Sequence, residues 1–329
     1  MESRMTSSAT WPCAALPLAD LSARTTIRVG GRAEWLLEPA TPEELREAWL
    51  AALEFGVTPR VLGGGANIAI DDGVLPGVVI GTDRLRRVFR PLAAGDEAGD
   101  EHSALAPPSA MVLPDPAEDP RLVAWCGATL PSLLRAARDL GYSGLEGLVG
   151  VPGNVGGGVA MNAGGRWGEM WDVVESVRVL EPDGELRDLP RDECAPTYRN
   201  GGLGGRVVVG VVLKFRPEPR LTVAARMKDY LREKNKVQPV TERSAGCTFK
   251  NPDPELAGGR SAGELLDDVG AKALARGDAI VSPLHANFII NRGNATAADV
   301  FTLMEDMRDL VAQKTGIALE FEVKRWRPV

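Results

Sequence analysis

The segment GLEGLVGVPGNVGGGVAMNAGG at residues 144–165 limits the folds open to this chain more than any other feature. Glycine loses much backbone freedom on folding, so a segment this rich in glycine predicts a loop rather than the interior of a helix or strand. Pro152 stiffens the loop, and the three glycines at 156–158 remove side chains from it. Such a backbone suits close approach to a flat or extended ligand.

A second glycine run, LGGGANIAI at residues 62–70, follows an expected strand. It can be a tight turn between two strands, or a place where backbone N–H groups converge on an anion. It is not a dinucleotide-binding fingerprint, because Ile68 stands at the third glycine position and no helix is expected after it. Neither loop carries the GK[ST] of a Walker motif. Two such loops, with Asn154 and Asn162 as uncharged donors in the longer one, suggest one long cofactor with a central diphosphate, for which FAD is the natural candidate.

The composition excludes several classes of protein. The 329 residues are 44% hydrophobic and 25% charged, as in globular proteins of two or three domains. A net charge of −7 argues against a nucleic-acid-binding or anionic-membrane surface. Four scattered cysteines without a CxxC pair, and only two histidines, argue against a metal site or a disulfide framework. With no apolar signal segment and no long apolar run, the chain is expected to be cytoplasmic.

Several elements can be expected from local patterns. Helices are predicted at 41–56, 129–141 and 296–316. The first has Thr41 as N-cap and Glu44 as the partner that completes a capping box. The other expected elements are a hairpin turning at 182–184, a buried strand at 206–217, and a mobile, disordered insertion at 91–120 that is rich in Pro, Ala, Asp and Glu.

The motifs GGGANIAI, GVPGNVGGGVAMNAGG, TYR, SAGCTFKNP, HANFIIN and LEFEVKRW occur in this order. Together they resemble the UDP-N-acetylenolpyruvoylglucosamine reductase (MurB) family over residues 21–326. The resemblance implies an α+β chain with a two-subdomain FAD-binding fold of the PCMH/vanillyl-alcohol-oxidase type, followed by an α+β substrate-binding domain. The expected division is 1–82 and 83–217 for the two FAD subdomains and 218–329 for the substrate domain. A monomer is expected.

The resemblance also implies a reaction. NADPH reduces noncovalently bound FAD, and hydride then passes to UDP-N-acetyl-3-O-(1-carboxyvinyl)glucosamine, giving UDP-N-acetylmuramate for peptidoglycan synthesis. Hydride addition to the far carbon of the enol ether leaves negative charge on the near carbon and its carboxylate. A positive group must stabilise that charge, and a donor must protonate the near carbon.

The family motifs assign these roles to three residues. Arg199 in the Tyr-Arg motif matches the positive group, and a guanidinium suits a planar carboxylate. Cys247 stands where the family more often has a serine that donates the proton, and a thiol with a reference pKa of about 8.5 can do the same. Glu320 and Glu322 share one face if the segment is a strand, so spacing does not choose between them. The family motif favours Glu322, as a group that helps Arg199 polarise the carboxylate.

Binding contacts are expected around these groups. Asn251 matches a residue near the substrate diphosphate, its neighbour Lys250 either meets a phosphate or is solvated, and Tyr198 contacts substrate or flavin. The chain resembles a shorter subtype that lacks a tyrosine-bearing loop over the UDP, so Tyr230 and Lys236 are candidates for that role. The cofactor contacts are expected at Gly63, Gly64, Gly65, Ala66, Asn67, Gly153, Asn154, Gly156, Gly157, Met161, Asn162 and Ala163. His285, in HANFIIN, is expected to support the third domain.

Two alternatives stay open. One is a different FAD oxidoreductase on the same scaffold, such as a sugar or alcohol oxidase with covalent FAD, although no histidine lies near either glycine loop. The other is a non-catalytic protein that binds FAD or a UDP-sugar. The presence of Arg199, Cys247 and Glu322 together argues against it.

Overall fold

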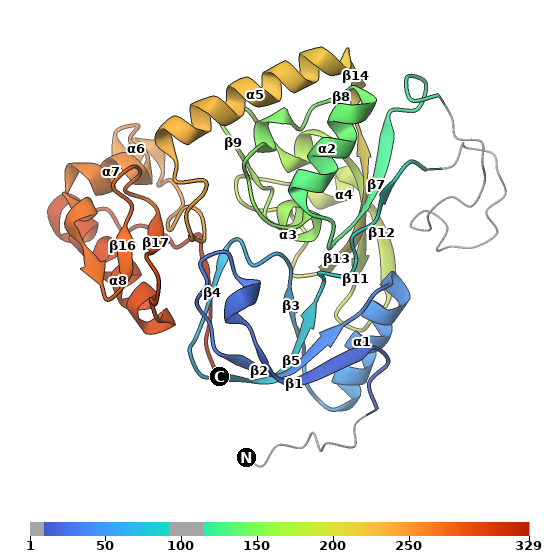
Figure 1. Ribbon diagram of the computed structural model, residues 1–329, viewed down its shortest axis with the longest axis horizontal. Helices are drawn as coiled ribbons and strands as arrows, with labels where there is room; N and C mark the ends of the chain where they lie inside the picture. The colour runs from blue at the N-terminus through green and yellow to red at the C-terminus, as the bar shows by residue number, and fades with distance from the viewer. Residues whose placement is uncertain (1–9, 92–114, 329) are drawn as a thin grey trace. The chain divides into compact units, whose positions relative to one another are not determined.

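The computed structural model describes residues 10–91 and 115–328 (Figure 1). The chain forms two compact units. Unit 1 comprises Met1–Ala15, Leu37–Gly64 and Val78–Glu233, and unit 2 comprises Leu16–Leu36, Gly65–Gly77 and Lys234–Val329. The boundaries between the units fall within β1 (Ala14–Asp20), β2 (Arg32–Glu38), β5 (Val74–Gly81) and α5 (Arg220–Val237), and between Gly64 and Gly65 in the short glycine loop. The division at residues 82 and 217 expected from sequence stays a prediction.

A five-stranded antiparallel sheet forms the centre of unit 1, with strand order β12-β11-β13-β7-β6. The predicted hairpin is confirmed, because β11 and β12 pair on either side of a turn in which Gly184 has φ +90°. The expected buried strand is also confirmed as the central β13. The strands are β6 (Val88–Phe89), β7 (Arg121–Trp125), β11 (Val174–Leu180), β12 (Leu186–Pro190) and β13 (Val207–Lys214).

Helices α2 (Leu130–Leu140) and α3 (Val155–Ala160) pack against this sheet (Figure 1). Helix α2 begins and ends as predicted, since the Thr129 hydroxyl accepts from Ser132 N at 3.1 Å and Gly141 is left-handed. The remaining elements of unit 1 are α1 (Pro42–Glu54), β3 (Arg60–Leu62), β8 (Tyr142–Ser143), β9 (Gly164–Gly165), β10 (Gly168–Glu169), α4 (Arg191–Cys194) and β14 (Arg216–Pro217).

Helix α1 begins at the predicted cap, but the capping box is only half formed. The Thr41 hydroxyl accepts from Glu44 N at 3.2 Å. The Glu44 carboxylate, however, accepts from Ala40 N at 2.7 Å, one residue before the cap. The Thr41 hydroxyl thus satisfies one N–H of the first turn, and the Glu44 carboxylate holds the backbone that leads into the helix.

The prediction that residues 144–165 hold no helix is wrong, because α3 lies within them. One of its glycines is required by packing, because a Cβ at Gly156 would lie 2.8 Å from the Cys126 Cβ. Contacts with β13 and β7 therefore stabilise a short helix whose intrinsic propensity is poor.

Unit 2 is built around α8 (Ala297–Thr315). Thr296 and Asp299 form a capping box, Gly316 ends the helix, and its apolar stripe is buried as predicted, with Leu310 partly buried. A three-stranded sheet, β15-β16-β17, packs against α8, and β18 pairs in parallel with β4. The elements are β4 (Ile68–Ile70), α6 (Pro254–Ala257), α7 (Ala262–Asp268), β15 (Ala275–Arg276), β16 (Ala279–Val281), β17 (Ile289–Asn291) and β18 (Lys324–Trp326).

The insertion expected at 91–120 falls mostly outside the described residues, which omit 92–114. Residues 115–120 are ordered by a turn in which Asp119 N donates to Asp115 O at 3.0 Å. Pro120 O then accepts from Phe215 N at 2.9 Å, which leads the chain into the sheet of unit 1.

Candidate active site

Two glycine loops meet in unit 1. A Cβ added to Gly64 would lie 2.7 Å from Asn154 Oδ1 and 2.8 Å from Gly153 Cα, so the two loops touch along bare backbone. By contrast, a side chain at Gly63 would meet nothing closer than 3.9 Å, and one at Gly157 nothing within 4 Å. The adjoining loops thus leave open space beside exposed backbone. This arrangement fits an extended cofactor held by main-chain groups.

Asn162 ties the end of the glycine segment to other loops of unit 1. Its amide nitrogen donates to Glu169 Oε2 at 2.7 Å and to Thr197 O at 3.2 Å, while its Oδ1 accepts from Trp171 N at 3.2 Å. The residue is buried and has φ +46°, which asparagine tolerates better than most residues. Its side chain therefore positions the loop, and the cofactor contact expected of it stays a prediction.

Arg199 lies in a strained tight turn next to the glycine segment. Thr197 N donates to Asn200 O at 2.8 Å and Asn200 N donates back to Thr197 O at 3.1 Å, which leaves Tyr198 and Arg199 at the tip. Arg199 has φ +56°, a conformation that glycine or asparagine adopts more readily. Its Nη1 donates to Gly164 O at 3.0 Å, and its guanidinium lies 5.0 Å from the Tyr198 ring centroid. Strain of this kind is often retained where a side chain has a function.

Cys247 lies in unit 2 on a loop held by a buried asparagine. Asn287 accepts from Phe249 N at 2.9 Å through Oδ1 and donates to Phe249 O at 2.8 Å through Nδ2. Its carbonyl also accepts from Thr248 N at 2.8 Å. The Cys247 thiol is half-buried, and a side chain at the preceding Gly246 would meet nothing closer than 3.9 Å. The backbone is thus fixed while one side of the loop stays open to a ligand.

Glu322 is bonded to the Cys247 loop and to the second half of the short glycine loop. Glu322 N donates to Thr248 O at 2.8 Å, and the Asn67 amide donates to Glu322 O at 3.0 Å. Asn67 O in turn accepts from Lys324 N at 3.0 Å, where β18 begins beside β4. The Glu322 residue is 7% exposed. Unit 2 therefore brings together the predicted thiol, the predicted acid and part of the predicted cofactor loop.

The expectation that Glu320 and Glu322 share a face is wrong. The Glu320 side chain is 72% exposed and its carboxylate lies 2.5 Å from Lys250 Nζ, whereas Glu322 is buried. The chain here is not a regular strand: Phe321 forms an isolated bridge with Phe249, and their rings stack at 5.2 Å. Burial thus separates the two acids where sequence spacing could not.

The other expected binding residues have structural contacts of their own. Asn251 Oδ1 accepts from Ala262 N at 3.1 Å, at the first residue of α7. The Tyr230 ring stacks on Trp167 at 5.1 Å, which joins α5 to the β9–β10 hairpin, and Lys236 is exposed near the end of α5. The substrate contacts of Lys250, Asn251, Tyr230 and Lys236 stay predictions.

Two residues that sequence reasoning missed shape the site. Asn287 lies in HANFIIN, a motif in which only His285 had been assigned a role from the sequence. Thr26 lies in TTIRVGG at residues 25–31, where a threonine pair ahead of a glycine pair was the available signal. Its backbone N–H donates to Gly65 O at 3.0 Å, and its hydroxyl donates to Ser244 O at 2.6 Å.

His285 has the structural role that was expected. Its Nδ1 accepts from Asn287 N at 3.2 Å, its ring lies edge-on to Phe288, and a Cβ at Gly263 would be 2.7 Å from the imidazole. Burial, with a smaller effect of the Lys272 charge, lowers the pKa of His285 below its ordinary value.

This pKa gives a prediction for stability. The folded state binds the imidazole proton less readily than the unfolded state, so the contribution of neutral His285 is complete above the ordinary pKa of about 6.5 and is lost as pH falls through the lower folded-state pKa. In urea unfolding between pH 8 and pH 5, His285→Asn keeps an acceptor for Asn287 N and should show a shallower loss of stability than the wild type. Parallel pH curves for the two proteins would contradict this assignment.

The described residues hold no group of three or more His, Cys, Asp or Glu side chains placed to bind a metal ion. Among the helices in the described part of the chain, none is long and apolar enough to cross a membrane.

Comparison with known proteins decides the family. The UDP-N-acetylenolpyruvoylglucosamine reductase of Deinococcus radiodurans is 40% identical over 310 residues, which cover 93% of this chain and 94% of that protein. This chain belongs to the UDP-N-acetylenolpyruvoylglucosamine reductase (MurB) family. The enzyme of the same name from Rhodospirillum rubrum is 37% identical over 302 residues, covering 92% of this chain and 86% of the relative.

Domain and structure comparisons agree with the MurB assignment. The model for the C-terminal domain of this reductase matches residues 238–326, which include Cys247 and Glu322, and a model for an FAD binding domain matches residues 112–190, which include the long glycine segment. The crystal structure of MurB from Thermus caldophilus covers 95% of this chain and 98% of its own, with 34% identity and a TM-score of 0.74. The predicted fold class, an FAD-binding fold with a following α+β domain, is confirmed.

Proposed function

We propose that this chain is an FAD-dependent reductase that converts UDP-N-acetyl-3-O-(1-carboxyvinyl)glucosamine to UDP-N-acetylmuramate in peptidoglycan precursor synthesis. NADPH is the proposed hydride donor. Membership of the MurB family and the FAD-binding domain support the reaction. One observation carries the proposal: the half-buried Cys247 and the buried Glu322 lie on two segments that are joined by the hydrogen bond from Glu322 N to Thr248 O at 2.8 Å. The Asn67 amide, in the loop that begins at Gly65, also donates to Glu322 O.

FAD, when bound, supplies the hydride that reaches the far carbon of the enol ether. The Cys247 thiol gives its proton to the near carbon, so that one hydride and one proton together saturate the double bond. The open side of the loop at Gly246 lets the substrate carbon approach the sulfur. A second proton from solvent restores the thiol before the next turnover.

Arg199 and Glu322 act on the substrate carboxylate, where negative charge develops. The guanidinium offers paired donors of the right spacing, and its turn fixes its backbone in advance. In its protonated form, the buried Glu322 would donate a hydrogen bond to that carboxylate and so add to the stabilisation given by Arg199. This division of roles gives charge stabilisation to Arg199 and Glu322, and proton delivery to Cys247.

A product assay tests the proposed reaction. The FAD-loaded protein is incubated with NADPH and the enolpyruvyl substrate, and the UDP-sugar is analysed by mass spectrometry. A product heavier by two hydrogens is expected, with one NADPH consumed for each product formed. NADPH consumption without reduced UDP-sugar would reject the substrate and leave only a flavin reductase.

The UDP end of the substrate gives a separate prediction. Tyr230→Phe keeps the stack on Trp167 and removes only the hydroxyl, and Lys236→Ala removes one exposed charge. If these groups bind the UDP, each change should raise the substrate KM about 10- to 100-fold with a smaller change in kcat, as for loss of one hydrogen bond to a charged group. Lys228→Ala, another exposed lysine of α5, is the control. An unchanged KM in both variants would remove this assignment.

The remaining features of the proposal follow from the substrate. We expect the reaction to take place in the cytoplasm, where a UDP-sugar for peptidoglycan precursor synthesis would be used. The net charge of −7 gives no reason to expect nucleic acid as a partner. We expect a monomer that binds FAD noncovalently.

A further inference from the structure

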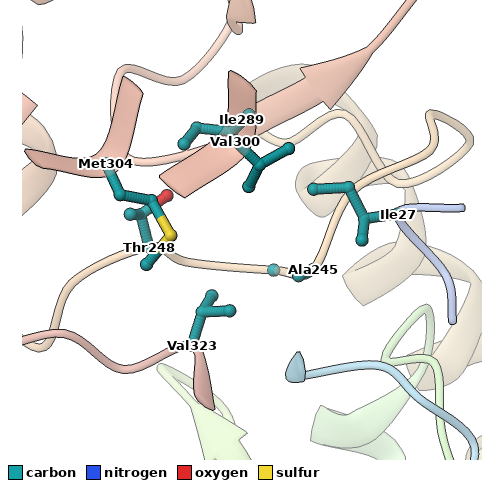
Figure 2. Close-up of a pocket in the computed structure, with 8 residues that line it drawn as sticks. Ile27, Ala245, Thr248, Ile289, Val300, Met304 and Val323 are labelled. Carbon is teal, nitrogen blue, oxygen red and sulfur yellow. The ribbon is translucent and has the colours of Figure 1, made fainter. Parts of the chain in front are cut away.

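A small apolar cavity lies on one side of the loop that carries Cys247. Figure 2 shows apolar side chains gathered around the stretch from Ala245 to Thr248, where a cavity of about 10 Å³ lies. The cavity is lined by Ile27, Ala245, Gly246, Thr248, Ile289, Val300, Met304 and Val323. A space this small and apolar barely admits one water and offers it few partners. No polar group of the cavity lining supports the loop from this side, and the hydrogen bonds that fix its backbone lie at its two ends, at Ser244 and Thr248.

The end of the loop after Cys247 is held by elements of unit 2 already described. Thr248 N donates to Asn287 O at 2.8 Å, and Thr248 O accepts from Glu322 N at 2.8 Å. The end before Cys247 is held at Ser244, whose carbonyl accepts the Thr26 hydroxyl at 2.6 Å. Gly246, between these anchors, has φ +81° and gives the loop its sharp bend.

Thr26 contacts the cofactor loop as well. Its N–H donates to Gly65 O at 3.0 Å, and the same carbonyl lies 3.3 Å from the Thr26 hydroxyl. The hydroxyl has one proton, and the shorter distance assigns it mainly to Ser244 O. Gly65 itself is seated tightly on this segment, because a Cβ there would lie 2.1 Å from Arg24 O. One threonine thus joins the loop at Gly65 to the loop that carries the thiol.

We propose that Thr26 is a positioning residue that fixes the Cys247 thiol relative to the cofactor loop, so that the proton and the hydride reach adjacent carbons of one substrate. This inference rests on the proposed function. Misplacing a reacting group by about 1 Å can cost about 100-fold in rate, so loss of the hydrogen bond that anchors the loop before Cys247 should have a large effect on the step that uses the thiol. Flavin reduction by NADPH does not use the thiol and should be insensitive to Thr26.

Three variants separate positioning from general stability. Thr26→Val has nearly the same shape and lacks the hydroxyl, whereas Thr26→Ser retains it. Thr25→Val is the matched control, because the possible acceptors of the Thr25 hydroxyl, Val29 O at 3.0 Å and Ser22 O at 3.1 Å, belong to neither loop. Each protein is saturated with FAD, and the two half-reactions are followed anaerobically by stopped-flow: flavin reduction by NADPH, then reoxidation by the enolpyruvyl substrate.

For Thr26→Val, the maximal reoxidation rate should fall about 10- to 100-fold, with the substrate concentration at half-saturation and the reduction rate changed less than about 3-fold. Thr26→Ser should lie within about 3-fold of the wild type, and Thr25→Val should keep both rates even if it melts earlier. Wild-type reoxidation by the substrate is the separate check on the proposed function.

Equal reoxidation rates in Thr26→Val and wild type would overturn the inference. So would a fall in the reduction rate of Thr26→Val as large as the fall in its reoxidation rate. A reoxidation rate that falls as much in Thr25→Val as in Thr26→Val would also overturn it. If Thr26→Val does not fold, Thr26→Ala and Thr26→Cys are measured in its place. A hydroxyl-free variant that matches Thr26→Ser in reoxidation rate then overturns the inference in the same way.

Discussion

Cys247→Ala is expected to slow reoxidation of the flavin by the enolpyruvyl substrate about 1,000-fold and to leave flavin reduction by NADPH unchanged. General acids in enzymes contribute about 100- to 10,000-fold, and alanine leaves no proton at this position. The half-buried thiol at the open side of the loop is the group placed to donate it. Stopped-flow absorbance at the flavin band measures both half-reactions in one protein.

Two further variants control this experiment. Cys247→Ser restores a proton donor of the kind that other family members are expected to use, and should recover most of the reoxidation rate. Cys13→Ala removes another half-buried thiol and should change neither half-reaction. A Cys247→Ala enzyme that reoxidises as fast as wild type would exclude the thiol from the chemistry.

Arg199→Asn is expected to lower kcat about 100- to 1,000-fold without lowering the melting temperature. Removing one preorganised donor from a developing negative charge has effects of this size. Asparagine tolerates the left-handed φ of +56° better than arginine, so the turn between Thr197 and Asn200 should persist or gain stability. Activity and thermal melting are measured on the same preparation, and the opposite directions of the two effects identify a strained functional residue.

Arg187→Asn is the control for this substitution, because Arg187 is an exposed residue paired with exposed Glu193 at 2.9 Å. Such pairs contribute little, so both kcat and melting temperature should be nearly unchanged. If Arg199→Asn kept wild-type kcat, or if it melted well below wild type, the turn would be structural rather than catalytic.

Local signals in the sequence predicted much of the fold. Thr129 with Gly141 and Thr296 with Gly316 mark the ends of α2 and α8, because caps and left-handed glycines act over a few residues. The hairpin turn at Gly184 is equally local. The prediction of a loop without a helix at 144–165 failed because it depended on contacts between residues far apart in the sequence. Helix α3 forms despite its glycines because Gly156 packs against Cys126, thirty positions earlier.

The candidate site was predictable only in part, for the same reason. The motif order pointed to Cys247 and Glu322, which unit 2 brings together through Thr248. Spacing could not separate Glu320 from Glu322, because their exposure depends on how Phe321 stacks on Phe249. Thr26 was missed because its partner, Ser244, lies 218 residues away along the chain, and no short pattern encodes such a hydrogen bond.

The anaerobic visible spectrum of the FAD-loaded protein tests the central claim most directly. NADPH should bleach the flavin band, and the enolpyruvyl UDP-N-acetylglucosamine added next should restore the oxidised spectrum within the time of a few turnovers. That sequence would establish both half-reactions on the same cofactor. A flavin that bleaches with NADPH and stays bleached with this substrate would contradict the proposed reductase activity.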